Sequence, residues 1–372
     1  MGTAKGDTAE EYARRGGFSL VTQIRFVLLS PFSAEGYRKY SRAVGVPTRV
    51  AVYGGRYYRL LFLLKYNCRL VRQKEKNMKK NTLFTGAATA LVTPMTKDGI
   101  DYESFARLVE FQINGGIDAL VVCGTTGEAS TLTDEEHREA IKFVVKQTAG
   151  RVPVIAGTGS NDTDYAVDLT RFSCEAGVDG VLVVTPYYNK ATQKGLIKMY
   201  ETIADASTKP MILYNVPSRT GVNIAPETYA ALADHENIAA VKEASGDFSK
   251  LAQSMALVGD KLDFYSGNDD QIVPVLSLGG KGVISVLSNI MPRATHDMCA
   301  KFFAGDVAGS ARLQLELLPL VNALFCEVNP IPAKAATAAM GYGENYLRLP
   351  LTPIEEAHGE KLYALMREQG LI

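Results

Sequence analysis

The sequence predicts an α/β protein whose strands close into a (β/α)8 barrel, with a basic N-terminal leader and a C-terminal helical extension. From Ala87 onward, short apolar runs alternate with amphipathic segments at intervals of roughly 20 to 35 residues. Eight such runs occur, whereas an open doubly wound sheet usually has fewer parallel strands. With 372 residues and 47% hydrophobic content, the chain can bury the core that a barrel with an appendage requires.

Each predicted strand is a short run of mostly small or β-branched apolar residues. Runs without polar alternation are typical of parallel strands that are covered on both faces. Most of these runs end in a small or polar residue, which marks the start of a loop. The eight predicted strands cover residues 87–93, 119–123, 153–157, 180–185, 210–215, 238–243, 263–267 and 282–287.

Helix signals lie between the strands and after the last one. Thr133 and Glu136 form a predicted capping box, and the apolar residues behind them recur at helical spacing. Beyond Pro292 the strand pattern ends, so we predict a barrel domain over residues 78–300 and a packed C-terminal helical extension over residues 301–372. Helical patterns after Pro292 cover residues 294–303, 308–325, 332–340 and 353–369.

Residues 1–77 form the basic leader. They hold 15 Lys and Arg against 5 Asp and Glu, and the remaining residues hold 25 against 35. The leader does not have the pattern of a signal peptide, and an organelle transit segment or a basic face for a membrane surface are two interpretations of it. We favour a third, in which Met78 is a natural bacterial start and the leader is disordered or wrongly included. Residues 74–77 can be encoded by a purine-rich run that resembles a ribosome-binding site.

Composition and spacing exclude several classes of site. Five cysteines lie far apart without a C-x-x-C spacing, which excludes a disulfide framework and a zinc site and fits a reducing cytoplasm. No apolar run approaches the roughly 18 residues of a membrane span, and we expect neither a membrane nor a nucleic-acid partner. Gly157-Thr158-Gly159 lacks the third glycine of a dinucleotide loop. Asp269 and Asp270 are predicted helix-start residues, so no metal is expected.

Lys242 stands at the carboxyl end of the predicted sixth strand, after the apolar residues 238–241. A lysine in a partly desolvated site loses some preference for its proton, and its free amine can attack a carbonyl carbon. The alternative is a lysine on the rim that is paired with Glu243, and the Lys-Glu dipeptide alone favours that interpretation. The motifs after the other strands decide between the two.

The loops after the strands carry polar motifs, and in a barrel of this type the chemistry lies at the carboxyl ends of the strands. Gly-Thr-Thr-Gly-Glu stands at residues 124–128, where glycines permit close backbone approach and hydroxyls can hold a carboxylate. Thr-Pro-Tyr-Tyr-Asn follows at 185–189, and Tyr-Asn-Val-Pro-Ser-Arg-Thr-Gly at 214–221. Taken alone, these motifs are also compatible with a capped turn, packed tyrosines and a solvated Arg219.

Together with Val-Lys-Glu-Ala at 241–244 and Ser-Gly-Asn-Asp-Asp at 266–270, these motifs occur in one order on successive strand ends. In that order the chain closely resembles the dihydrodipicolinate synthase family, over about residues 81–372. The resemblance implies a TIM barrel that assembles as a homo-oligomer, typically a tetramer built from dimers. It also implies the condensation of pyruvate with L-aspartate 4-semialdehyde to 4-hydroxy-tetrahydrodipicolinate. That reaction is the first committed step of diaminopimelate and lysine synthesis.

The resemblance implies four catalytic residues. Lys242 matches the lysine that forms an imine with pyruvate, so no cofactor is expected. Tyr214, Thr125 and Tyr188 match a proton relay, and Tyr188 matches a position that reaches into the site of a neighbouring subunit. These roles suit the residue types, because an iminium makes the pyruvate methyl acidic and hydroxyl groups can both donate and accept protons.

Four further residues match the substrate pocket of the family. Thr126 matches the contact to the carboxylate of pyruvate, and Gly267 and Ile284 match positions that line the same pocket. Arg219 matches the arginine that meets the carboxylate of the semialdehyde. A guanidinium suits that role, because it binds a planar carboxylate with two hydrogen bonds and keeps its charge at any working pH.

Two other functions were weighed against this one. N-acetylneuraminate lyases resemble the same barrel and share the lysine and tyrosine, but they usually carry serine in place of Thr125 and lack an arginine matching Arg219. A catalytically silent scaffold is the second alternative, and the intact set of Lys242, Tyr214, Thr125 and Tyr188 argues against it. Assays for retro-aldol cleavage and for condensation, run side by side, distinguish a lyase of that kind from a synthase.

The resemblance also predicts weak or absent feedback inhibition by lysine. Three positions of the effector site of related enzymes are matched, namely His137, Asn161 and Tyr187. Three others depart from the serine, histidine and glutamate that sensitive members commonly carry, namely Ala129, Asp134 and Tyr165. The missing glutamate matters most, because a neutral phenol cannot replace a carboxylate that faces an ammonium group. Asp134 could supply a substitute charge if it turned toward the site.

Overall fold

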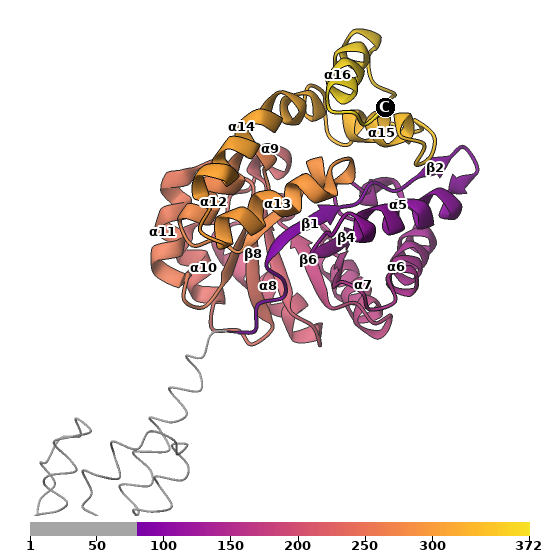
Figure 1. Ribbon diagram of the computed structural model, residues 1–372. Helices are drawn as coiled ribbons and strands as arrows, with labels where there is room; N and C mark the ends of the chain where they lie inside the picture. Colours follow the sequence, from indigo (N-terminus) through magenta and orange to yellow (C-terminus); the bar gives the residue numbers. More distant parts are fainter. Residues whose placement is uncertain (1–79) are drawn as a thin grey trace, which may run out of the picture. The chain divides into compact units, whose positions relative to one another are not determined.

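The structure is a computed structural model and describes residues 80–372, so the predicted leader lies outside the described residues. All eight predicted strands are formed. They close into a parallel barrel in the order β1-β10-β9-β8-β7-β6-β5-β4, which confirms the predicted fold class (Figure 1). The barrel strands are β1 (Gly86–Ala90), β4 (Ala119–Val122), β5 (Val154–Gly157), β6 (Gly180–Val184), β7 (Met211–Asn215), β8 (Ile238–Glu243), β9 (Asp263–Ser266) and β10 (Gly282–Ser285).

The first strand is shorter than the sequence predicts. Strand β1 ends at Ala90, although the apolar run continues through Val92. The backbone N–H of Val92 donates to the side chain of Asn289, and the Thr93 hydroxyl donates to the carbonyl of Gly127. These residues are buried under loops at the carboxyl end of the barrel, and burial without strand pairing has the same apolar signature as a strand.

The barrel separates two apolar cores, because successive side chains of a strand point to opposite faces. The inner core fills the barrel with alternate residues of the strands, and at its amino end the ring of Phe84 stacks on Tyr265 at 4.2 Å. The outer core lies between the strands and the surrounding helices. Inner-core residues include Ala88, Val121, Ile155, Leu182, Ile212 and Ile284.

Helices alternate with the strands along the chain, as the sequence predicts. Helix α6 begins with the predicted capping box, in which the Thr133 hydroxyl accepts from the Glu136 N–H and the Glu136 carboxylate accepts from the Thr133 N–H. A short hairpin, β2 (Met95–Thr96) and β3 (Gly99–Ile100), follows β1. The helices that accompany the strands are α5 (Tyr102–Asn114), α6 (Asp134–Thr148), α7 (Thr163–Glu175), α8 (Gln193–Ala206), α9 (Pro217–Thr220), α10 (Pro226–Leu232), α11 (Phe248–Val258), α12 (Ile272–Ser277) and α13 (Pro292–Phe303).

The C-terminal extension consists of α14 (Val307–Leu324), α15 (Ile331–Ala339) and α16 (Glu356–Glu368). Figure 1 shows α15 and α16 on the side of the barrel toward which β1 runs, opposite to the side where the chain enters it. The extension therefore lies near the carboxyl ends of the strands. The predicted boundary at residue 300 falls inside α13, which packs on β1, so a boundary after Phe303 keeps that helix whole. Within residues 80–372, no helix combines the length and the hydropathy needed to cross a membrane.

Candidate active site

Lys242 and Tyr214 lie side by side at the carboxyl end of the barrel. They are paired in the parallel register of β7 and β8. The Lys242 side chain is 5% exposed, and its Nζ lies 4.3 Å from the centroid of the Tyr214 ring. The residue is thus a largely buried amine against an aromatic face and close to a phenol. An amine in such a place is suited to nucleophilic attack on a carbonyl carbon.

Glu243 does not pair with Lys242, so the rim ion pair that the dipeptide suggested is not formed. The Glu243 carboxylate accepts from Asn215 Nδ2 at 3.0 and 3.1 Å, from the Tyr229 hydroxyl at 3.0 Å and from the Ser245 N–H at 2.8 Å. Adjacent residues of a strand point to opposite faces, so this network lies outside the barrel wall behind Lys242. It holds β7 and β8 together directly beside Lys242 and Tyr214.

Gly267 leaves the space that the Lys242 side chain occupies. A Cβ at this position would lie 2.6 Å from Ala244 Cβ and 3.2 Å from Lys242 Cε. The first distance is shorter than carbon atoms tolerate, and the second would press on the lysine stem. Ile284 of β10 is buried in the inner core together with Tyr214 and Ala244. The structure therefore places Gly267 against the Lys242 side chain, and Ile284 in the same inner core as Tyr214.

A cavity of about 490 Å³ opens beside this pair. Thr125 of the loop after β4, Tyr214 of β7 and Arg219 of α9 line it, so two predicted relay residues and the predicted carboxylate-binding arginine border the same space. Lys242 is not among the lining residues, but its Nζ lies against the ring of Tyr214, which is one of them. The cavity also extends along Ala129, His137, Tyr165 and Tyr187, the region of the predicted effector site.

Thr126 and Arg219 are joined by a residue that sequence reasoning missed. Asn329 Nδ2 donates to the Thr126 hydroxyl at 3.0 Å, and Arg219 Nη2 donates to the main-chain oxygen of Asn329 at 3.0 Å. Asn329 lies between α14 and α15, in the C-terminal extension, and is buried. One residue of the extension thus contacts both predicted carboxylate-binding side chains.

A buried ion pair ties the same loop to the extension. Lys334 of α15 is paired with Glu128, and their side chains are 2% and 1% exposed. The Glu128 backbone is left-handed, with a φ of 54°, and its second carboxylate oxygen accepts from the Arg348 N–H. Sequence reasoning missed this pair as well. The available signal was a single lysine inside the apolar run Ile331–Ala339, since a buried charge requires a partner.

Tyr188 is the one predicted site residue that the structure turns away from its own site. Its side chain is 94% exposed, and its backbone is left-handed with a φ of 70°. The neighbouring Tyr187 lines the cavity, whereas Tyr188 does not. A bulky residue with positive φ is uncommon, and such strain is often found at functional positions.

Asp269 stabilises the loop after β10. One carboxylate oxygen accepts from the N–H groups of Val286 and Leu287, each at 2.9 Å, and burial raises the pKa of this carboxyl. The residue begins the short 3-10 helix η2 (Asp269–Gln271), as predicted. Among residues 80–372, no three acidic, histidine or cysteine side chains gather as a group that could hold a metal ion.

The predicted effector region is built around Asp134. Tyr165 donates its hydroxyl to Asp134 at 3.0 Å, and Arg138 Nε donates to the other carboxylate oxygen at 2.8 Å. The hydrogen bond from Arg138 holds the pKa of Asp134 below its usual range, whereas burial and Asp134 raise the pKa of Tyr165 to about 12. The phenol is therefore neutral, and the charge of Asp134 is already paired with an arginine.

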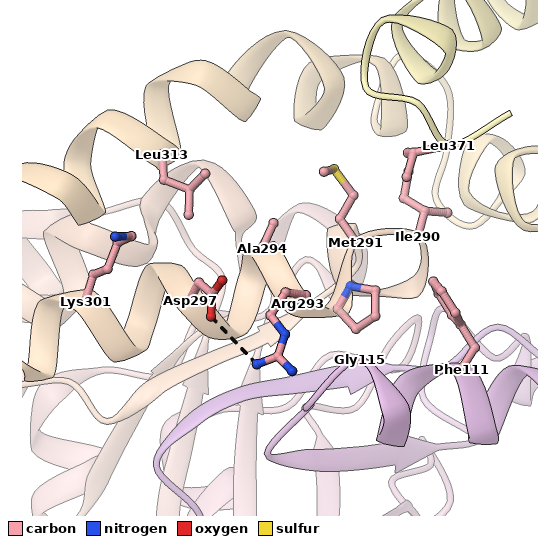
Figure 2. Close-up of a pocket in the computed structure, with 11 residues that line it drawn as sticks. Phe111, Gly115, Ile290, Met291, Arg293, Ala294, Asp297, Lys301, Leu313 and Leu371 are labelled. Carbon is pink, nitrogen blue, oxygen red and sulfur yellow. Dashed lines mark ion pairs between the residues drawn. The ribbon is translucent and has the colours of Figure 1, made fainter.

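A second cavity, of about 470 Å³, lies between α5, α13 and α14 (Figure 2). Its walls are mostly apolar, and Arg293 and Asp297 face each other beside it at 4.0 Å. None of the predicted site residues lines it. The chemistry is therefore assigned to the first cavity.

The comparison with known proteins agrees with this geometry. The model of the dihydrodipicolinate synthetase family matches residues 83–369. The 4-hydroxy-tetrahydrodipicolinate synthase of Lachnoclostridium phytofermentans is 56% identical over 292 residues, which cover 78% of this chain and 99% of that protein. The remaining share of this chain corresponds in size to the segment before the barrel.

Solved structures give the same result. The dihydrodipicolinate synthase of Thermotoga maritima is similar with a TM-score of 0.77 and 42% identity, covering 78% of this chain and 100% of that one. The chloride-inhibited enzyme of Acinetobacter baumannii, complexed with pyruvate, is similar with a TM-score of 0.76 and 43% identity, and covers 78% and 100%. With its barrel, its buried lysine and these relatives, the chain belongs to the dihydrodipicolinate synthetase family.

Proposed function

We propose that Lys242 carries the chemistry of this protein by forming an imine with the ketone carbon of pyruvate. The observation that supports this role is the position of its amine, largely buried and 4.3 Å from the centroid of the Tyr214 ring. The amine adds to the carbonyl carbon, the oxygen leaves as water, and a protonated imine remains. Addition of the amine and loss of water each require a proton transfer to or from the substrate oxygen. A nearby hydroxyl group can carry out these transfers, and Tyr214 provides one.

The protein is a Schiff-base-forming lyase that condenses pyruvate with L-aspartate 4-semialdehyde to 4-hydroxy-tetrahydrodipicolinate, the first committed step of diaminopimelate and lysine synthesis. The protonated imine withdraws electrons, so the former pyruvate methyl loses a proton and becomes an enamine carbon. That carbon bonds to the aldehyde carbon of the second substrate. The amino group of the second substrate then attacks the imine carbon, which closes the ring and releases Lys242.

No separate cofactor takes part in this proposal, because the imine itself is the electron sink. Tyr214 and Thr125 are proposed to move the protons, and both line the cavity. Thr126 is proposed to bind the carboxylate of pyruvate, in a pocket shaped by Gly267 and Ile284. Arg219, which lines the cavity, is proposed to bind the carboxylate of the semialdehyde.

Trapping with borohydride tests the imine. Reduction in the presence of pyruvate is expected to add one pyruvyl group per chain at Lys242, located by mass spectrometry of peptides. Lys242→Arg should abolish the adduct and keep the fold, because a guanidinium retains the charge but is not a free amine. The matched control is Lys281→Arg, at the amino end of β10, which should still be labelled. An adduct at Lys281 in the unaltered protein would overturn the assignment.

We further propose that the protein works as a homo-oligomer, as a tetramer built from dimers, in which Tyr188 completes the proton relay of a partner chain. The exposure of this aromatic side chain on a left-handed backbone supports the proposal. A mixture of Lys242→Arg chains with Tyr188→Phe chains provides the test. Mixed dimers contain one site with an intact Lys242 and an intact Tyr188, so refolding the two together should restore activity. No recovery in confirmed mixed dimers would contradict this role.

A cytoplasmic location is likewise proposed. Four cysteines of the described residues, Cys123, Cys174, Cys299 and Cys326, are free thiols, and two of them are buried in the barrel. Burial raises the pKa of Cys123 and of Cys299 far above their usual range, so both remain protonated packing residues. Unpaired cysteines are typical of proteins that stay in a reducing compartment.

A further inference from the structure

Asn329 holds two groups that are far apart in the sequence and belong to different substrate subsites. Its side-chain amide donates to Thr126, 203 residues away, and its main-chain oxygen accepts from Arg219, 110 residues away. Asn329 and Thr126 are both buried. The hydrogen bond to Thr126 is buried, so water does not compete for it and it restrains the Thr126 hydroxyl, whereas the contact to Arg219 is only partly buried because Arg219 itself is exposed.

The direction of the first hydrogen bond determines what the Thr126 hydroxyl can do. An amide nitrogen only donates, so the Thr126 oxygen is the acceptor here and its own proton is free. Among residues 80–372, the structure shows no other hydrogen bond of that hydroxyl. A proton that is not engaged with the protein is available to a bound carboxylate, which only accepts.

The other atom of the Asn329 amide adds an independent observation. Asn329 Oδ1 is buried and has no hydrogen-bond partner among the described residues. A buried polar atom without a partner is costly and is uncommon away from functional sites. The hydrogen bond from Nδ2 to Thr126 is therefore the only one that holds the side-chain amide of Asn329 among the described residues.

The buried pair of Lys334 and Glu128 fixes the segment that carries Asn329 to the loop that carries Thr126. Lys334 lies five positions after Asn329, and Glu128 lies two positions after Thr126. Separating the two members of a buried pair would leave a buried charge without its counter-ion, which is strongly unfavourable. The ion pair therefore keeps the two segments in contact. The extension is thus locked onto the site at two neighbouring points.

We propose that Asn329 is a positioning residue of this enzyme, which orients the Thr126 hydroxyl toward the carboxylate of pyruvate and sets the place of Arg219 for the carboxylate of the second substrate. The inference rests on the proposed function of the site. It assigns the C-terminal extension a part in catalysis: one residue outside the barrel determines the spacing of the two carboxylate-binding groups. Asn329 acts through these partners and touches neither substrate.

Two substitutions of Asn329 separate this role from a merely structural one. Asn329→Ala removes the donor and should raise the KM for pyruvate about five- to tenfold, the range of one lost hydrogen bond. Asn329→Asp has the same shape but only accepts, so it should accept a hydrogen bond from the Thr126 hydroxyl, place a negative charge beside the pyruvate carboxylate and raise that KM further. The main-chain contact to Arg219 remains in both, so the KM for the semialdehyde should change less than about twofold.

A double-mutant cycle with Thr126→Val makes the test sharper. If Asn329 acts through the hydroxyl, Asn329→Ala should have no further effect on the KM for pyruvate once Thr126 is valine. Asn322→Ala, an exposed asparagine of α14, is the matched control and should leave both KM values unchanged. Thermal unfolding of every variant reports on the fold, and Asn329→Ala with the cycle decides the matter if Asn329→Asp does not fold.

Three results would overturn the proposal: an unchanged KM for pyruvate, equal rises of both KM values, or additive effects in the cycle. Borohydride trapping of the unaltered protein separates this outcome from failure of the proposed function. If no imine forms at Lys242 in that protein, the function is wrong. If the imine forms and the Asn329 variants trap pyruvate at normal concentrations, only the positioning role is wrong.

Discussion

Asn215 and Glu243 are hydrogen-bonded to each other on the outer side of β7 and β8, one position beyond Tyr214 and Lys242 in the same register. The hydrogen bond between Asn215 and Glu243 therefore fixes the register in which Tyr214 and Lys242 lie opposite each other. A slip of the register by one residue would turn the side chains of Lys242 and Tyr214 out of the barrel, because the side-chain period of a strand is two. The carboxylate behind the lysine serves to align the strands and does not neutralise the amine.

Glu243→Ala is expected to lower the free energy of unfolding by about 3 kcal/mol, because Asn215 and Tyr229 lose their shared buried acceptor. Tyr229→Phe removes a single hydrogen bond to the same carboxylate and should cost about 1.5 kcal/mol. Urea unfolding at one fixed protein concentration measures both, since oligomer stability depends on concentration. Equal losses for the two variants would show that Asn215 does not depend on Glu243.

Arg219→Ala is expected to damage use of the semialdehyde and to leave trapping of pyruvate largely intact. The loss of a charge-assisted contact should cost on the order of 1.5 to 3 kcal/mol in transition-state stabilisation, which is a fall of roughly tenfold to over a hundredfold in kcat/KM. Arg219→Lys keeps the charge but lacks the planar guanidinium, so its kcat/KM should lie between those of the unaltered enzyme and of Arg219→Ala. If trapping declined as much as turnover, the assignment of Arg219 to the second substrate would be wrong.

His137 makes the stability of the barrel sensitive to acid. Burial lowers the pKa of this imidazole below its usual value near 6.5, and its Nε2 lies 2.9 Å from the carbonyl oxygen of Gly157. Below about pH 6.5 the unfolded chain therefore binds a proton that the folded chain does not yet bind, and stability falls as the pH decreases. The contribution of one such group is at most about 1.4 kcal/mol per pH unit.

His137→Gln should flatten this dependence between pH 6.5 and the folded-state pKa, because glutamine does not titrate. Urea midpoints of both proteins, measured from pH 7.5 to pH 5, provide the comparison. The variant is expected to be less stable than the unaltered protein at pH 7.5, owing to its looser packing, and to lose less on acidification. Parallel curves would rule out His137 as the source of the acid sensitivity.

Lysine is expected to inhibit the enzyme weakly or not at all. The phenol of Tyr165 is neutral, and the carboxylate of Asp134 is already bonded to Arg138, so neither offers a free negative charge to an ammonium group. Asp134 is therefore not available as a substitute for the missing glutamate. Activity should persist as lysine is titrated into the millimolar range, and Tyr165→Glu should increase sensitivity. Half-inhibition of the unaltered enzyme at sub-millimolar lysine would refute this expectation.

The sequence predicts the barrel well because its strands are buried on both faces and are therefore apolar throughout. Val92 is buried but not paired with a neighbouring strand, so the apolar pattern alone places the end of this strand too late. The strand-end rule indicated which residues to consider, because the fold brings all strand ends to one face, and the family resemblance then implied a role for each of them. Lys242 and Tyr214 need only this rule to come together.

Asn329 and Lys334 escape such reasoning for a physical reason. Their partners Thr126 and Glu128 lie more than 200 positions away, and no helical or strand period connects them. An asparagine before a proline is typical of any turn. Its contacts with Thr126 and Arg219 arise from the docking of the extension on the barrel, which is set by tertiary packing.

The attachment of the extension to the strand-end loops has a consequence for synthesis on the ribosome. All eight strands, Lys242 included, are translated before Asn329 and Lys334, and domains tend to fold from the amino end as they emerge. The nascent barrel therefore exposes Glu128 without its counter-ion and Thr126 without its hydrogen-bond donor. Lys242 is translated first, and the contacts that Asn329 and Lys334 make with the loop after β4 form only when the end of the chain arrives. We therefore expect a chain that ends before Asn329 to be less active than the complete one.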